Sequence, residues 1–115
     1  MYLYLGDFAA GLPNGQGIFL YENGDKYDGE VKMGKKHGFG IYYTSKGNRY
    51  EGSYHQDSRH GSGIYYWANG LKEFSEYEDG KENGAARLYV PNGWQWLLPP
   101  QFLLKKPYNI SSSLD

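Results

Sequence analysis

The sequence predicts an all-β fold, namely a single-layer antiparallel meander of consecutive β-hairpins followed by an irregular C-terminal capping tail. Three observations lead to this prediction. A 23-residue repeat runs through most of the chain, all 17 glycines fall at fixed positions of that repeat, and the segments between them alternate polar and apolar residues. A helical period of 3.6 residues does not run through the repeats.

Composition limits both the core and the chemistry. The chain has 115 residues, enough for one small domain or a short repeat array. Aromatic residues make up 18% of it, which is too many for a disordered chain, while aliphatic residues are too few for a thick core. Cysteine is absent, which excludes disulfides and thiolate metal sites. The net charge of −1 gives no basic excess for binding nucleic acid.

The repeat sets the expected organisation of the chain. Three similar units cover residues 4–26, 27–49 and 50–72, and a degenerate fourth unit covers residues 73–95. We therefore expect a repeat array over residues 1–95 and a separate tail over residues 96–115. The apolar runs are too short to span a bilayer, and the start of the sequence has no signal-peptide features. These features favour a cytoplasmic protein.

The glycines fall into two classes when repeat positions are numbered from zero. Those at positions 7, 11 and 20 lie in polar stretches such as Gly34–Gly38, and we expect them to form hairpin turns. Those at positions 2 and 13 lie inside strand-like runs, where an aromatic ring from a neighbouring strand is expected to cover each of them. These structural glycines are Gly6, Gly29, Gly52, Gly17, Gly40 and Gly63.

The runs between the glycines supply two strands per repeat. Residues 27–31 and 50–54 alternate apolar and polar side chains and form the first strand of their units. The second strands, at residues 41–43 and 64–67, are apolar on both faces. Lys36 lies in the polar stretch between the two strands, and we expect it to be exposed.

Aromatic residues recur in step with the repeat and are the candidate binding residues. Since adjacent residues of a strand point to opposite faces, a single layer cannot cover all of them. One face is expected to pack its rings into a groove, and the other to expose an apolar strip that marks a binding surface. The candidates are Tyr4, Tyr27, Tyr50, Phe19, Tyr42, Tyr65, Tyr43, Tyr66 and Trp67.

The last twenty residues break the repeat pattern. They are apolar and rich in proline, which prevents a continuing strand or a regular helix. One interpretation is that this tail caps the last hairpin, and the other is that it docks onto a partner or a membrane surface. The candidate docking residues are Trp94, Trp96, Leu97, Leu98 and Phe102.

The best copy of the repeat reads Tyr27-Asp28-Gly29-Glu30-Val31, then Gly34-Lys35-Lys36-His37-Gly38-Phe39-Gly40. This pattern resembles the MORN (membrane occupation and recognition nexus) repeat, and the resemblance covers residues 4–95. It implies an elongated single-layer sheet that serves as a scaffold or docking surface. Proteins with similar repeats occur in radial spokes and other ciliary or cytoskeletal assemblies, and others bridge membranes.

Chemistry-bearing residues do not form a set that would support catalysis or metal binding. His37 and His60 share position 10 of their repeats, but the sequence does not supply a third ligand beside them. Ser53 and His55 lie two apart on one strand, yet an orienting group is missing and the other repeats do not keep them. We therefore expect neither an enzyme nor a cofactor or metal site.

Two functions remain. The leading hypothesis is a non-catalytic scaffold or adaptor for protein–protein interaction in a cytoskeletal assembly, such as an axoneme of a cilium or flagellum. Its partner would be a helix in the groove or a strand added to an open edge. The alternative is a peripheral membrane tether that binds anionic phospholipids. Charge disfavours the tether, because residues 1–95 hold 10 Lys and Arg against 12 Asp and Glu.

Overall fold

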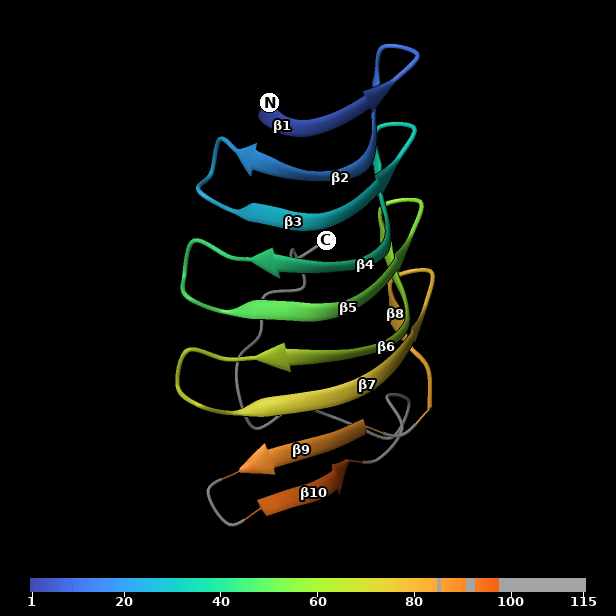
Figure 1. The fold of residues 1–115 in the computed structure, drawn as a ribbon. Helices are drawn as coiled ribbons and strands as arrows, with labels where there is room; N and C mark the ends of the chain where they lie inside the picture. Colours follow the sequence, from blue (N-terminus) through green and yellow to red (C-terminus); the bar gives the residue numbers. More distant parts are fainter. Residues whose placement is uncertain (85, 91–92, 98–115) are drawn as a thin grey trace.

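The computed structural model describes residues 1–84, 86–90 and 93–97, which form one open antiparallel sheet (Figure 1). The strands are β1 (Tyr2–Ala9), β2 (Leu12–Tyr21), β3 (Lys26–Lys32), β4 (Lys35–Tyr43), β5 (Arg49–His55), β6 (Ser58–Tyr66), β7 (Lys72–Glu78), β8 (Lys81–Glu82), β9 (Ala86–Val90) and β10 (Gly93–Leu97). The described residues include no helix, and therefore none that could cross a bilayer. The predicted all-β hairpin meander is confirmed.

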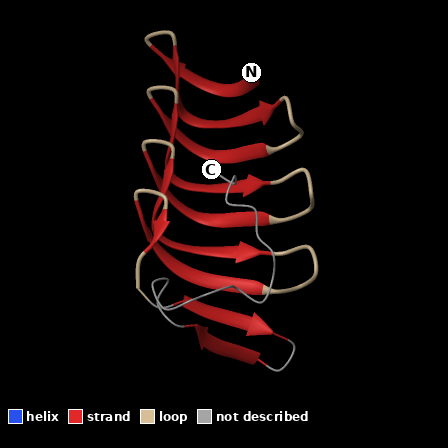
Figure 2. Cartoon of the chain, turned by 180° about the vertical axis from the view of Figure 1, so that it is seen from behind, coloured by secondary structure: helices blue, strands red, loops and turns tan. Residues whose placement is uncertain are grey.

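Consecutive strands are neighbours throughout the sheet. The order is β1-β2-β3-β4-β5-β6-β7-β9-β10, and the short strand β8 pairs with β7 beside β9. The molecule measures 46 × 24 × 22 Å, and its long axis crosses the strands. Figure 2, seen from behind, shows one layer whose strands curve in the same direction, so that the sheet has a concave and a convex face.

Tight two-residue turns join the strands of each hairpin at one side of the sheet. Both central residues have positive φ, between 48° and 51° at the first and between 75° and 85° at the second, as in type I′ turns. The central residues are Ala10–Gly11, Met33–Gly34, Gln56–Asp57 and Asp79–Gly80. The predicted turns at position 7 are therefore present. In the third repeat Asp57 replaces the glycine with a φ of 75°.

The last three tight turns also bond to the hairpin before them. The amide of Gly34 donates to the carbonyl of Pro13 at 2.9 Å, and the amide of Gly80 donates to the carbonyl of Arg59 at 2.9 Å. Asp57 makes two such bonds, because its amide donates to the carbonyl of Lys36 and its Oδ1 accepts from the amide of Lys36 at 2.8 Å. The second bond gives a physical reason for an aspartate at this turn.

Three of the four glycines at position 11 do not form turns, so the prediction is wrong for them, whereas Gly84 lies between β8 and β9 with a φ of 90°. Gly15, Gly38 and Gly61 lie inside β2, β4 and β6 with φ of 114°, 62° and 83°. They lie near points where the pairing register shifts in each hairpin. In each hairpin the second strand has two extra residues at this point, which bend the pair, and a glycine with positive φ fits such a bulge. The predicted turn at Gly34–Gly38 is thus a two-residue turn followed by a bent strand.

The fourth unit keeps the topology of the first three. β9 pairs with β7 as β4 pairs with β3, with Lys72 opposite Tyr89 and Phe74 opposite Arg87. Its second strand is divided into β8 and β9, whereas β2, β4 and β6 are continuous. The predicted boundary between array and tail at residue 95 stays a prediction, because residues 98–115 lie outside the described part.

Candidate functional site

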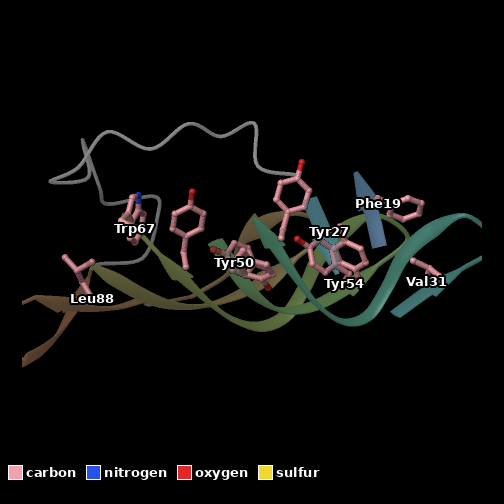
Figure 3. Close-up of a cluster of buried hydrophobic side chains, with 10 residues drawn as sticks. Phe19, Tyr27, Val31, Tyr50, Tyr54, Trp67 and Leu88 are labelled. Carbon is pink, nitrogen blue, oxygen red and sulfur yellow. The ribbon is translucent and has the colours of Figure 1, made fainter. Parts of the chain in front are cut away.

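The concave face carries one continuous cluster of aromatic side chains, which we call the aromatic trough. Figure 3 shows its labelled members standing on the same side of the sheet. Its buried members are Phe19, Tyr27, Tyr42, Tyr50, Tyr54, Tyr65, Trp67 and Tyr77, with Val31 and Leu88 among them and Tyr4, Tyr21 and Leu71 packed at its edge.

The floor of the trough is built from a tyrosine and two glycines per repeat. Gly40 on β4 lies directly opposite Gly29 on β3, and a Cβ on Gly40 would overlap the ring of Tyr27. The same relation joins Tyr4 to Gly17 and Tyr50 to Gly63. Tyr27 is 0% exposed, so its ring has no room to move aside. The rings predicted to cover position 13 therefore come from the neighbouring strand.

The glycines at position 2 are covered differently from the prediction. A Cβ on Gly29 would meet the backbone of Phe39 and Gly40 on the neighbouring strand, and the hydroxyl of Tyr27 from its own strand. Backbone approach, together with the preceding tyrosine of the same strand, accounts for the missing side chain here. The nearest groups at Gly6, Gly29 and Gly52 are this backbone and the tyrosine two residues earlier in the same strand.

Hydrogen bonds from the floor tyrosines and to the acidic residue at repeat position 3 stabilise the bulge in each of the first two hairpins. The hydroxyl of Tyr27 donates to the carbonyl of Glu30 at 2.6 Å, and that of Tyr4 donates to the carbonyl of Asp7 at 2.7 Å. The carboxylate of Glu30 accepts from the amide of Phe39 at 2.7 Å. These bonds satisfy backbone groups that the register shift leaves out of the ladder.

The rings in the middle of the trough meet edge to face. Tyr54 lies between Tyr27 and Tyr50, with ring centroids 5.3 and 5.5 Å away and interplanar angles of 87° and 89°. Tyr50 meets Tyr77 at 5.6 Å and 90°. Trp67 follows β6 and packs on Tyr65 with ring centroids 4.4 Å apart. This geometry adds to the stabilisation that burial alone provides.

Two buried cations line the trough, and the sequence analysis missed both. Lys36 is 3% exposed, and its Nζ lies 5.1 Å from the ring centroid of Tyr42 and 5.4 Å from that of Tyr54. The expectation that Lys36 is exposed is wrong. The sequence feature that could have predicted this burial is the even spacing of Lys36 from Tyr42 on β4, because residues two apart in a strand share a face.

Arg59 occupies the same repeat position in the next unit. It is 7% exposed, and its Cζ lies 4.9 Å from the ring centroid of Tyr50 and 5.0 Å from that of Tyr77. Its Nη1 donates to the hydroxyl of Tyr77 at 3.0 Å. Lys36 and Arg59 thus place positive charge against the negative faces of the rings.

Burial changes the acidity of the trough tyrosines. It raises the pKa of Tyr77 to about 12, although Arg59 acts in the opposite direction. Burial also raises the pKa of Tyr27, and the nearby Glu30 adds to this effect. The pKa of Tyr21 is raised by burial and then by Asp57. All three hydroxyls are therefore neutral at physiological pH.

The fourth repeat replaces the tyrosine and glycine of the floor by a polar pair. Glu73 takes the place of the tyrosine and Ser75 that of the glycine, and both are buried. The hydroxyl of Ser75 donates to Oε2 of Glu73 at 2.9 Å. The floor of the trough therefore gains one acidic side chain in the fourth repeat.

An open hollow of about 680 Å³ lies at the N-terminal end of the trough. Its aromatic wall is formed by Tyr2, Phe19, Tyr21 and Tyr42. Lys36 and Asp57 from the next two hairpins contribute one charge of each sign. The hollow therefore offers apolar surface with a few polar groups, a composition typical of sites that accept an anchoring side chain.

The convex face carries the second set of candidate aromatics, Tyr43 and Tyr66, and cations lie over both rings. Tyr43 and Tyr66 are half-buried. Nζ of Lys26 lies 4.6 Å from the ring centroid of Tyr43, and Cζ of Arg49 lies 3.9 Å from that of Tyr66. Each of these two rings is therefore covered by a cation from the strand opposite it.

The candidate residues thus divide between the two faces. The trough brings together Tyr4, Tyr27, Tyr50, Phe19, Tyr42, Tyr65 and Trp67, whereas Tyr43 and Tyr66 lie on the convex face. The backbone of Trp94, Trp96 and Leu97 belongs to β10, which pairs with β9. The side chains of these three residues, and the whole of Leu98 and Phe102, lie outside the described part. The prediction of a docking tail is therefore untested.

Comparison with protein families matches the MORN repeat to residues 4–26, 27–49 and 50–72. The chain belongs to the MORN repeat family. The three matched units coincide with the predicted repeats, and the degenerate fourth unit lies beyond the match. Repeats of this family suggest a protein that takes part in protein or membrane interaction, and MORN repeat proteins are generally non-catalytic. A comparison with curated proteins gives no match.

Proposed function

We propose that this MORN repeat protein is a non-catalytic adaptor that binds a protein segment along its aromatic trough. The observation that carries the proposal is the open hollow beside Tyr21 and Tyr42, because it is a place where a partner's side chain can enter. The remaining floor of the trough is packed ring against ring and serves as a rigid support. Rigid aromatic walls are typical of interface anchors.

Exposed apolar side chains gather beside the hollow and support the same proposal. Phe8 is 61% exposed, and Tyr2 is also exposed. These residues belong to the first strand, so the hollow and the apolar edge form one surface at the N-terminal end of the sheet. A helix presenting apolar residues at one-turn spacing fits such a surface, and strand addition to β1 is the second mode.

The type of assembly is a further part of the proposal. Family resemblance supports a subunit or adaptor of a cytoskeletal assembly, such as that of a cilium or flagellum. Charge supports a protein partner over an anionic membrane, because residues 1–95 hold 12 Asp and Glu against 10 Lys and Arg. Two cations of the convex face, Lys26 and Arg49, also lie over tyrosine rings. Those of the trough, Lys36 and Arg59, are buried.

A matched pair of variants tests the proposal. A partner captured by the intact chain is titrated against Tyr21→Ser, which alters the hollow, and against Tyr66→Ser, which alters the convex face. We expect the first change to weaken binding by about 2 kcal/mol, as truncation of an interface anchor does. The second change should leave the affinity unchanged. If Tyr66→Ser weakens binding and Tyr21→Ser does not, or if only anionic vesicles bind the chain, the proposal is wrong.

A further inference from the structure

The three histidines lie in a row on the face opposite the trough, away from the proposed binding surface. His37 is on β4, His55 on β5 and His60 on β6. The ring centroids of His37 and His55 are 5.4 Å apart, and those of His55 and His60 are 5.5 Å apart. The repeat relates His37 to His60, but His55 comes from another position of the repeat and stands between them.

The pairing of the strands explains this arrangement. Gly38 pairs with Tyr54, so the residues next to them, His37 and His55, come opposite each other on neighbouring strands. On the other side, His55 pairs with Ser58 on β6, and His60, two residues after Ser58, lies diagonally beside His55 on the same face. Tyr54 points into the trough, and its neighbour His55 therefore points to the convex face.

We propose that His55, together with either His37 or His60, chelates one divalent transition-metal ion, which we take to be Zn²⁺. Zinc binds imidazole nitrogen at about 2.0–2.1 Å, which places the centres of two rings on one ion roughly 4.5–5.5 Å apart. Both histidine pairs lie within that range. The ring spacing of either pair therefore suits coordination of one ion.

The site has two protein ligands at a time rather than three. Among the residues that the structure describes, no group of three or more His, Cys, Asp and Glu side chains converges on one point. The row is linear, so His37 and His60 approach the ion only in alternation around the shared ligand His55. Water completes the coordination shell. Imidazole ligands favour zinc, copper and nickel over magnesium and calcium, which prefer oxygen.

Calorimetric titration of the intact chain with ZnCl₂ tests the proposal, since His55 is exposed and its replacement leaves the core untouched. We expect one ion per chain. His55→Gln removes both pairs and should weaken zinc binding by about tenfold or more. His37→Gln and His60→Gln each leave one pair and should weaken it only about twofold. The double variant that carries both His37→Gln and His60→Gln should bind zinc as weakly as His55→Gln.

The pattern among these variants decides the outcome. The proposal is wrong if His55→Gln binds zinc with the affinity of the unchanged chain. It is also wrong if His37→Gln or His60→Gln alone lowers the zinc affinity as much as His55→Gln does. A wild-type titration without measurable zinc binding overturns it too. MgCl₂ serves as the control ion and should give no binding. Circular dichroism of each variant without metal checks that the fold is intact.

Discussion

Tyr27 and Gly40 form one packing unit, in which the ring of the first occupies the space that a side chain on the second would need. The same unit recurs at Tyr4 with Gly17 and at Tyr50 with Gly63, so each of the three repeats contributes one. Glycine normally weakens a strand, and here it is required because the ring has no other place to lie. The array thus gains a buried aromatic floor without a second layer.

Gly40→Ala should therefore destabilise the fold. The added methyl group overlaps the ring of Tyr27, and overpacking of this kind costs roughly 1–3 kcal/mol. In a Tyr27→Leu background the ring is gone, so the cost of the alanine should shrink by at least about 1 kcal/mol. Urea unfolding of the four proteins measures this coupling. Equal costs in both backgrounds would show that the ring is not the cause.

Lys36 and its neighbour Lys35 offer a matched pair of replacements. Lys36 is buried against Tyr42 and Tyr54, whereas Lys35 is exposed. Lys36→Ala removes a packed stem and a cation near two rings, which should cost about 1–2 kcal/mol. Lys35→Ala should change the free energy of unfolding by less than about 0.5 kcal/mol. Thermal unfolding checks both, and a silent Lys36→Ala would contradict the buried position.

Stability should fall at alkaline pH because of the buried tyrosines. Burial raises the pKa of Tyr77 from 10.0 to about 12, so the unfolded chain loses this proton first. The contribution of this neutral hydroxyl to the free energy of unfolding is complete below pH 10. It is lost as the pH rises to 12, at about 1.4 kcal/mol per pH unit.

Tyr77→Phe is the variant that isolates this effect. It removes the ionisable group, so the free energy of unfolding should fall less steeply between pH 10 and 12 than in the unchanged chain. Urea unfolding at intervals across this range gives the slopes. The loss of the hydrogen bond from Arg59 shifts the whole curve but does not alter its slope. Parallel curves would contradict the assignment.

The hairpin is the element that the sequence predicts well. Glycine spacing predicts the tight turns, and the alternation around Tyr27 and Tyr50 predicts which side chains enter the trough. The bulges were missed because a glycine with positive φ suits a turn and a bulge equally, so local sequence does not separate Gly34 from Gly38. The burial of Lys36 was not predicted, because a charged residue in a polar stretch suggests exposure. Its even spacing from Tyr42 places both side chains on the same face of β4.

Register between hairpins makes the repeat length itself testable. Gly17 pairs with Gly29 across the first junction, and Gly40 pairs with Gly52 across the second. Deleting residues 27–49 removes 23 residues and brings Gly17 opposite Gly52, which restores the same pattern. We expect this shortened chain to fold, with lower stability because one interface between units is lost.

Deleting residues 27–48 is the control for that experiment. It removes one residue fewer, so the third unit would enter the sheet with its aromatic side chains on the convex face. We expect this chain to lose cooperative unfolding, measured by circular dichroism against temperature. If both deletions unfold with the same cooperativity, the register does not depend on the repeat length.

At the scale of the whole molecule, the two faces of one sheet have different roles. The trough gathers the rings and the buried cations, and the open hollow lies at its N-terminal end. The convex face carries tyrosines beneath cations and the row of histidines. Periodicity predicted that the aromatics divide between two faces. It did not predict the cations over Tyr43 and Tyr66, because cross-strand partners depend on register.

Site-specific photo-crosslinking tests most directly the central claim that the trough is the face that binds a protein partner. A benzophenone amino acid replaces Tyr21 at the hollow or Tyr66 on the convex face, and each chain is irradiated with the captured partner. The account predicts a covalent product from position 21 and none from position 66. A product from position 66 alone would contradict it, because the partner would then lie on the convex face.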